Sequence, residues 1–334
     1  MSCTIRDVAK LAGVAVSTAS LALNGHKSVR DTTRERVLQA AAKLHYQPNA
    51  VARSLVTHKT QTIGVLMPDL GDPYYHEIFG GIDQWAHDNE YSVVLAYTKR
   101  DAEREAHYLQ VLQEKRVDGI IFMGAGFQED QHLQPLLTAM PPVVLIGRHH
   151  LPFPSIVPDN EGGAYAALSH LLQLGHRNIA IVTGPMVLTT VQDRLAGCRR
   201  ALADYGVAYR PELVIHADFT PEGGLVAMQK LLQRTSIPTA VFAGNDQMAF
   251  GAVQAIYAAG WRIPEHISVI GFGDIPLSRY LYPSLSTVSI PLRQMGGQAA
   301  AMLASIVNKE EQVQEGTHLL PVKLICRAST GNII

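Results

Sequence analysis

The clearest pattern of ionisable side chains lies in the first sixty residues. This segment holds nine Lys and Arg against three acids, a net charge of +6, whereas residues 61–334 hold 19 bases and 26 acids, a net charge of −7. Lys and Arg neutralise phosphates, so a basic segment on an acidic body is typical of a chain whose one end meets nucleic acid. The charge pattern therefore predicts that the N-terminal segment binds DNA.

Elsewhere the spacing of reactive side chains does not favour catalysis. The sequence has no Gly-x-Ser-x-Gly elbow, no phosphate-binding P-loop and no His-Glu-x-x-His pair, and Gly124-Ala125-Gly126 lacks the remaining glycine of a dinucleotide fingerprint. His149-His150 has no partners at metal-ligand spacing. We expect a protein that is not an enzyme and holds neither metal nor cofactor. The cysteines are odd in number and widely spaced, which favours a reducing, cytoplasmic compartment: Cys3, Cys198 and Cys326.

Short helices are predicted at the N-terminus. Thr4 and Asp7 have the spacing of a capping box, and Gly13 suits the left-handed residue that closes a helix. A second short helix follows within four residues, which is the arrangement of a helix-turn-helix unit. Thr32 and Glu35, again at capping-box spacing, predict the start of a third helix that runs to about Leu44.

The N-terminus also has features of a secretion signal. Residues 11–23 follow Arg6 and Lys10 and resemble the apolar part of a secretion signal, which would make the body an exported binding protein. Asp7, the hydroxyl residues and the long basic stretch that follows argue against a signal. No segment has 18 consecutive apolar residues, so no membrane span is expected.

From residue 62 onward, short apolar runs alternate with helical patterns. Because such alternation produces parallel sheets with helices on both faces, the body is predicted to be α/β, with two doubly wound lobes and a ligand site at the carboxyl ends of the strands. The expected strands are 63–67, 93–96, 119–123, 143–146, 179–182, 213–215, 240–243 and 267–271. The expected helices are about 76–89, 102–115, 130–139, 161–174, 192–205, 221–233 and 247–259.

These features together resemble the lactose/galactose-repressor family of bacterial regulators. The resemblance rests on the head and on the runs Asn49–Leu55, Gly175–Ala180, Arg194–Gly197, Gly244–Ala249 and Ser268–Phe272. It implies a helix-turn-helix head at 1–47, a hinge helix and linker at 48–60, and a two-lobed effector and dimerisation domain at 61–334 of periplasmic-binding-protein type. The implied N-lobe covers about 61–158 plus 291–318, and the implied C-lobe about 159–288 plus 320–334. A C-terminal tetramerising heptad is missing.

The resemblance also implies which residues meet DNA. Val16, Ser17 and Leu21 hold positions that face base edges; apolar side chains at two of them favour contact with thymine methyl groups. Ala15 replaces the family's usual serine and removes an N-cap hydroxyl. The hinge helix is too short to be stable alone, and Leu55 holds the position of a leucine that wedges between base pairs. The full set of implied DNA contacts is Thr4, Val16, Ser17, Thr18, Leu21, Asn24, Asn49, Ala52, Arg53 and Leu55.

Effector contacts are implied in the same way. The positions at which the family stacks aromatic rings on the effector or hydrogen-bonds to it are Tyr74, Tyr75, Thr190, Arg194, Phe219, Asn245 and Asp274. This mixture suits a sugar or a similar small polar ring. The family's usual aspartate is Gly273 here, and Leu188 stands where a purine-binding relative has arginine, which argues against a purine.

The sequence and the resemblance together predict a cytoplasmic protein with no membrane association. The resemblance implies that it is a repressor that binds a near-palindromic operator in double-stranded DNA as a homodimer, under control of a small polar effector. The alternative is an exported or cytoplasmic binding protein without DNA activity.

Overall fold

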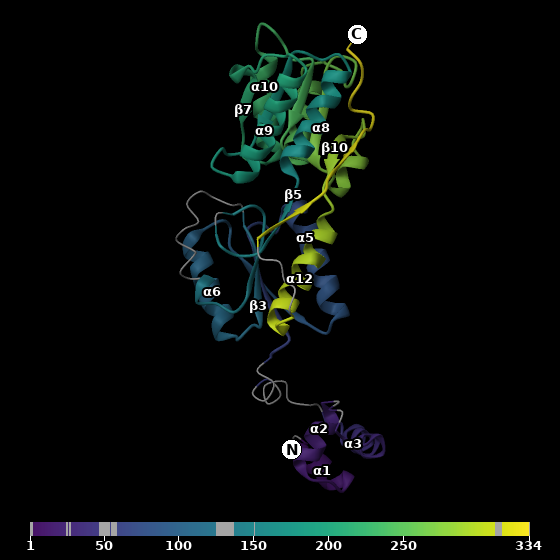
Figure 1. Ribbon diagram of the computed structural model, residues 1–334. Coiled ribbons are helices and arrows are strands. Elements are labelled where there is room, and N and C mark those ends of the chain that lie inside the picture. Colours follow the sequence, from purple (N-terminus) through teal and green to yellow (C-terminus); the bar gives the residue numbers. More distant parts are fainter. Residues whose placement is uncertain are drawn as a thin grey trace. The chain divides into compact units, whose positions relative to one another are not determined.

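The chain divides into two compact units, Met1–Thr60 and Gln61–Ile334. The computed structural model describes residues 3–24, 26, 28–46, 54, 59–124, 137–149, 151–310 and 316–333. The first unit is helical and the second contains sheets covered by helices (Figure 1).

The first unit consists of α1 (Ile5–Ala12), α2 (Val16–Leu23) and α3 (Asp31–Lys43). The predicted capping box is present: the Asp7 carboxylate accepts hydrogen bonds from the Thr4 backbone N–H at 2.9 Å and from the Thr4 hydroxyl at 2.7 Å. Gly13 ends α1 in the left-handed conformation, with φ at 66°. Val8, Ala19 and Val37 are buried together, one from each helix. This small core fixes α2 against the other two helices.

The start of α3 differs from the prediction. The helix begins at Asp31, with Arg30 as the N-cap residue and no side-chain cap, so Thr32 lies within the first turn. The Asp31 carboxylate instead accepts a hydrogen bond from Arg34 at 3.0 Å. The capping-box spacing of Thr32 and Glu35 was misleading because an acid one residue earlier already suits the helix N-terminus.

The second unit contains two sheets of six strands each. The first sheet has the order β11-β5-β4-β3-β1-β2 with all described pairings parallel. Its strands are β1 (Thr62–Met67), β2 (Ser92–Tyr97), β3 (Gly119–Met123), β4 (Val143–Ile146), β5 (Ser155–Pro158) and β11 (Thr317–Leu320). With its helices this sheet is called the N-lobe.

The second sheet has the order β12-β10-β9-β8-β6-β7, and only its edge pair β10–β12 is antiparallel among the described pairings. Its strands are β6 (Ile179–Thr183), β7 (Val214–His216), β8 (Ala240–Ala243), β9 (Ser268–Gly273), β10 (Ser286–Ser289) and β12 (Lys323–Ile325). With its helices this sheet is called the C-lobe. The predicted doubly wound α/β class is confirmed.

Helices cover both faces of each sheet, as the three buried clusters of this unit show. The N-lobe helices are α5 (Pro73–Asp88), α6 (Ala102–Glu114) and α12 (Leu292–Asn308). The C-lobe helices are α8 (Asn160–Gln173), α9 (Thr189–Asp204), α10 (Pro221–Leu232) and α11 (Asp246–Ala258), with short 3-10 turns at Pro211–Leu213 and Pro276–Arg279. The helix expected at 130–139 falls mostly outside the described residues.

Glycines set the closest approach of helices α5 and α12. A Cβ added to Gly296 would lie 2.0 Å from the Ile78 carbonyl oxygen, and one added to Gly81 would lie 1.9 Å from the Arg293 carbonyl oxygen. Only glycine lets two helix backbones come this near. Glu77 and Arg293 add an ion pair at 2.7 Å between the same helices.

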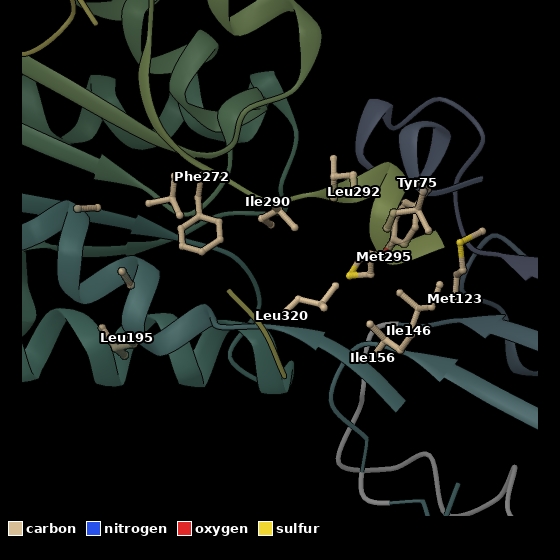
Figure 2. Packing of buried hydrophobic residues seen from close by; sticks show 14 of the residues in the cluster. Tyr75, Met123, Ile146, Ile156, Leu195, Phe272, Ile290, Leu292, Met295 and Leu320 are labelled. Atoms are coloured by element: carbon tan, nitrogen blue, oxygen red, sulfur yellow. The ribbon is translucent and has the colours of Figure 1, made fainter. Parts of the chain in front are cut away.

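The chain crosses between the lobes after β5, after β10 and after β11. The crossings carry buried apolar side chains, so one continuous cluster extends from one lobe to the other. Figure 2 shows Ile290, Leu292 and Leu320 lying between Phe272 on the C-lobe side and Tyr75 on the N-lobe side. The lobes therefore share core packing at the crossings.

Candidate functional site

A cavity lies between the lobes, at the carboxyl ends of the strands. It encloses about 760 Å³ of empty space, part of which is open to solvent. The N-lobe contributes Asp72, Tyr74, Tyr75, Arg100, Gly124, Ile146 and Gly147. The C-lobe contributes Leu188, Thr190, Arg194, Phe219, Asn245, Asp246, Gln247, Phe272, Gly273 and Ile275. Its place at the strand ends is typical of small-molecule sites in α/β proteins.

Arg194 on α9 is the most buried cation of the cavity wall, with 6% of its surface exposed. Its Nε donates to the Asn160 side-chain oxygen at 3.0 Å, and its Nη1 donates to the Gly244 carbonyl oxygen. The guanidinium carbon lies 3.9 Å from the centre of the Phe272 ring, a cation–π distance. Burial lowers the pKa of Arg194 to about 10, so the side chain remains a cation at neutral pH.

Aromatic side chains form other parts of the wall. The rings of Tyr74 and Tyr75, at the start of α5, lie 5.2 Å apart and perpendicular to each other. Burial raises the pKa of both hydroxyls, so both remain neutral and able to donate hydrogen bonds. Phe219 lies just before α10 with its backbone in the left-handed region, at φ 69°. A non-glycine residue in that region is held by its surroundings.

Asn245 supplies part of that restraint. As the N-cap of α11, its side-chain oxygen accepts from the Met248 N–H at 2.9 Å, while its amide nitrogen donates to the Phe219 carbonyl oxygen at 2.9 Å. One amide therefore fixes both the helix start and the aromatic residue next to the cavity.

Polar contacts also join the two lobes around the cavity. Gln247 of the C-lobe donates to the Asp72 carboxylate of the N-lobe at 3.0 Å. The Arg148 guanidinium, from the N-lobe, pairs with Asp193 of α9 at 2.6 Å, and its carbonyl oxygen accepts from the Thr189 hydroxyl at 2.7 Å. These contacts hold the lobes in the arrangement that forms the cavity.

Asp274, which the resemblance implies as an effector contact, is placed away from the other residues of that set. Its carboxylate pairs with Arg327 at 2.6 Å, and the residue is not part of the cavity wall. The neighbouring Gly273 lies on the wall instead, with φ at 135°. The acid next to this segment is Asp246, which is 1% exposed and accepts from the Ile275 N–H and from the hydroxyls of Ser278 and Thr287.

The other residues proposed for the effector all lie on the cavity wall: Tyr74, Tyr75, Thr190, Arg194, Phe219 and Asn245. The sequence interpretation missed Asp72, Arg100, Gln247 and Phe272. Each of these residues ends a strand, follows a strand or begins a helix. The rule that ligands bind at the carboxyl ends of strands would therefore have pointed to the chain segments that contain them. Which side chain of a segment turns inward depends on the lobe arrangement.

In the helical unit, α2 presents a largely apolar surface. Val16 is 43% exposed and Leu21 is 39% exposed, while Ser17 and Asn24 are also exposed. Thr18 is half-buried and Thr4, at the start of α1, is exposed. Ala15 is the N-cap residue of α2, as predicted, and its side chain makes no capping hydrogen bond to the helix. Asn49, Ala52, Arg53 and Leu55 lie outside the described residues.

Within the part of the chain that the structure describes, no cluster of His, Cys, Asp or Glu is arranged to hold a metal ion. Nor is any described helix both long and apolar enough to cross a membrane.

A helix-turn-helix unit in one chain with a two-lobed body that encloses a cavity defines the class of ligand-responsive DNA-binding regulators. Residues 4–49 match the model described as bacterial regulatory proteins, lacI family. Residues 168–330 match the periplasmic binding protein-like domain.

Relatives cover almost the whole chain. The ribose operon repressor of Haemophilus influenzae is 39% identical over 312 residues, which is 92% of this chain and 93% of that protein. Catabolite control protein A of Priestia megaterium is 35% identical over 99% of this chain and 100% of its own length. The PurR repressor of Aliivibrio fischeri is 36% identical over 98% of both chains.

Solved structures agree. The lac repressor dimer bound to operator and the anti-inducer ONPF is 30% identical, covers 99% of this chain and 100% of that chain, and superposes with a TM-score of 0.88. The chain belongs to the lacI family of bacterial regulatory proteins and is a transcriptional regulator. Its relatives are repressors rather than enzymes. The family and fold predicted from the sequence are confirmed.

Proposed function

We propose that this protein represses transcription by binding a near-palindromic operator as a homodimer in the cytoplasm, and that a small polar effector in the interlobe cavity changes its affinity for DNA. The observation that carries the proposal is the combination, in one chain, of a head with an exposed recognition-helix surface and a body with a cavity lined by aromatic and hydrogen-bonding groups. The ribose operon repressor and the PurR repressor, both relatives, support the direction of the regulation.

Helix α2 is proposed to read the operator in the major groove. Its sequence from Val16 to Leu23 contains no charged residue, so base discrimination depends on apolar contacts and hydroxyls. Val16 and Leu21 suit thymine methyl groups, and Ser17 can hydrogen-bond to several bases. The Lys and Arg residues elsewhere in the first sixty supply phosphate contacts and hence a steep salt dependence. The hinge residues Asn49, Ala52, Arg53 and Leu55 are proposed to meet the minor groove at the operator centre.

The effector is proposed to be a sugar or sugar derivative. Tyr74, Phe219 and Phe272 offer ring faces or edges, and Thr190 and Arg194 offer donors, which is the mixture that holds a polyhydroxylated ring. Leu188 on the wall is apolar and 3% exposed, so it cannot hydrogen-bond to a purine edge. Solved relatives bound to cellobiose and to ribose support a sugar-like ligand.

A truncation tests the assignment. The fragment 61–334 corresponds to a compact unit, and we expect it to fold and dimerise without binding DNA. The full chain should bind duplex DNA containing two half-sites about one helical turn apart, with affinity that falls steeply between 50 and 200 mM salt, as expected for a protein making about six to ten phosphate contacts. Operator binding by fluorescence anisotropy, with oligomeric state by light scattering, measures both. Undiminished DNA affinity in the fragment would contradict the proposal.

A further inference from the structure

No carboxylate of the described residues forms an ion pair with the Arg194 guanidinium. A buried guanidinium is costly unless it is paired and hydrogen-bonded, yet among the described residues its polar partners are two neutral oxygens, on Asn160 and Gly244. Arginine has five N–H donors. Two of them are used by these bonds, which leaves the others without an acceptor from the described residues.

The acids nearest to Arg194 are committed elsewhere. Asp246 and Asp193 both contribute to its electrostatic environment. Asp246 is surrounded by three donors of its own, and Asp193 pairs with Arg148 at 2.6 Å. Neither carboxylate therefore serves as the direct counter-ion of Arg194.

Two other described acids near the cavity also have partners. Asp72 accepts from the Tyr74 N–H at 3.0 Å and from Gln247 at 3.0 Å, with Arg100 as a nearby opposite charge. Asp274 is held by Arg327 at 2.6 Å. Position 273, which lies on the wall, is a glycine and brings no acid.

The rest of the wall adds further groups that can donate hydrogen bonds. Tyr74 and Thr190 line the cavity, and Arg100 brings a second guanidinium. A ligand with oxygen acceptors suits the Arg194 guanidinium, and a negative charge on that ligand supplies a direct counter-ion for it. Carboxylates and phosphates accept two parallel N–H bonds from one guanidinium, a geometry that a neutral hydroxyl cannot offer.

We infer that the effector is an anionic sugar derivative, a polyhydroxylated molecule whose carboxylate or phosphate is bound by Arg194. The inference rests on the proposed function, since it assigns the chemical class of the ligand in the same cavity. A sugar carboxylate and a sugar phosphate share the same recognition chemistry, which is an anionic pair of oxygens on a polyol. The hydroxyls of the ligand are then free to face the aromatic rings and Thr190.

Matched ligands test the inference on the full-length protein by isothermal titration calorimetry. The probes are D-glucose, D-gluconate and D-glucose 6-phosphate, together with D-ribose, D-ribonate and D-ribose 5-phosphate. Hydrogen bonds to charged groups contribute more than neutral ones, so the anionic member of at least one series should bind about tenfold or more tightly than its neutral parent. A preference for the acid identifies a carboxylate, and a preference for the ester identifies a phosphate.

A variant with a matched control assigns the preference to one side chain. Arg194→Gln should reduce the preference for the anion to nearly none. Arg199→Gln, on the same helix, should leave the preference unchanged, because Arg199 is exposed and stacks on Tyr209 away from the cavity wall. Thermal melts establish that both variants are folded. If Arg194→Gln does not fold, the comparison of ligands on the unaltered protein decides alone.

The outcomes separate this inference from the proposed function. Equal or tighter binding of both neutral parents, or failure of every anionic probe to bind the folded protein, overturns the anionic class. If a neutral sugar then weakens or strengthens operator binding, the proposed function stands and only the anionic class of the effector is given up. If the intact protein binds no operator DNA, the proposed function itself falls, whatever the ligand preference.

Discussion

The contact between helices α5 and α12 yields a prediction that can be sized from the structure. A methyl group at position 296 would lie 2.0 Å from the Ile78 carbonyl oxygen and 3.0 Å from the Ile82 nitrogen. Both neighbours are backbone atoms of a helix, so they cannot move without moving α5. Because Ile78, Ile82 and Met295 are fully buried around this contact, separating the helices also loosens their packing.

Gly296→Ala should therefore destabilise the protein strongly. Overpacking a well-filled core costs about 1–3 kcal/mol and occasionally more, and a clash with backbone belongs at the upper end. Since about 1 kcal/mol changes the melting temperature by roughly 2–4 °C in a protein of this size, we expect a loss of about 6–12 °C. Differential scanning fluorimetry of the full chain measures it.

The adjacent residue is the control. A methyl group at Gly297 would meet the Gly81 carbonyl oxygen at 3.6 Å, an ordinary contact. Replacing a glycine in a helix interior by alanine removes the entropic cost of about 0.5–1 kcal/mol. Gly297→Ala should therefore leave the melting temperature unchanged or raise it by about 1–4 °C. If the two variants melt together, the close approach of α5 and α12 is refuted.

Two further predictions concern pH and the hinge. Burial lowers the pKa of His176, whose ring contacts Thr239, Ser268 and the Gly331 carbonyl oxygen. The unfolded chain, in which this pKa is about 6.5, therefore binds the proton more readily than the folded chain. The stability that the neutral His176 ring contributes is complete above pH about 6.5 and is lost as the pH falls through the folded-state pKa. Urea unfolding between pH 7.5 and 5.5 should show a smaller pH dependence for His176→Gln than for the unaltered chain, and an equal dependence would contradict this role. Leu55→Ala should lower operator affinity about tenfold through lost apolar contact and reduce DNA bending, with the melting temperature of the free protein unchanged; equal bending by both proteins would remove the proposed wedge.

Much of the architecture was predictable from local patterns. The strands of both sheets that alternate with helices are continuous apolar runs, such as Gly119–Met123 and Ala240–Ala243, because parallel strands are buried on both faces. The missed elements lack that signal. The strand Ser286–Ser289 is rich in hydroxyl residues whose burial is stabilised by hydrogen bonds from distant segments, including the bond between Thr287 and Asp246.

The effector site shows a similar limit. Arg194 and Asn245 were found through the family resemblance of the runs that contain them, Arg194–Gly197 and Gly244–Ala249. The carboxylate of Asp274 accepts from Arg327, 53 residues away, whereas its chain neighbour Gly273 lies on the cavity wall. No local pattern reports a partner at that separation.

What the sequence by itself determined is the class of each segment: the capped first helix, the basic head, the apolar strands and the family to which they belong. These follow from properties of neighbouring residues, namely charge, helix capping and hydrophobic period. The tertiary structure alone decided which acids around Arg194 are already engaged with other described residues. Electrostatic balance in a buried site depends on distances between residues from different strands and lobes, and those distances exist only after the chain has folded.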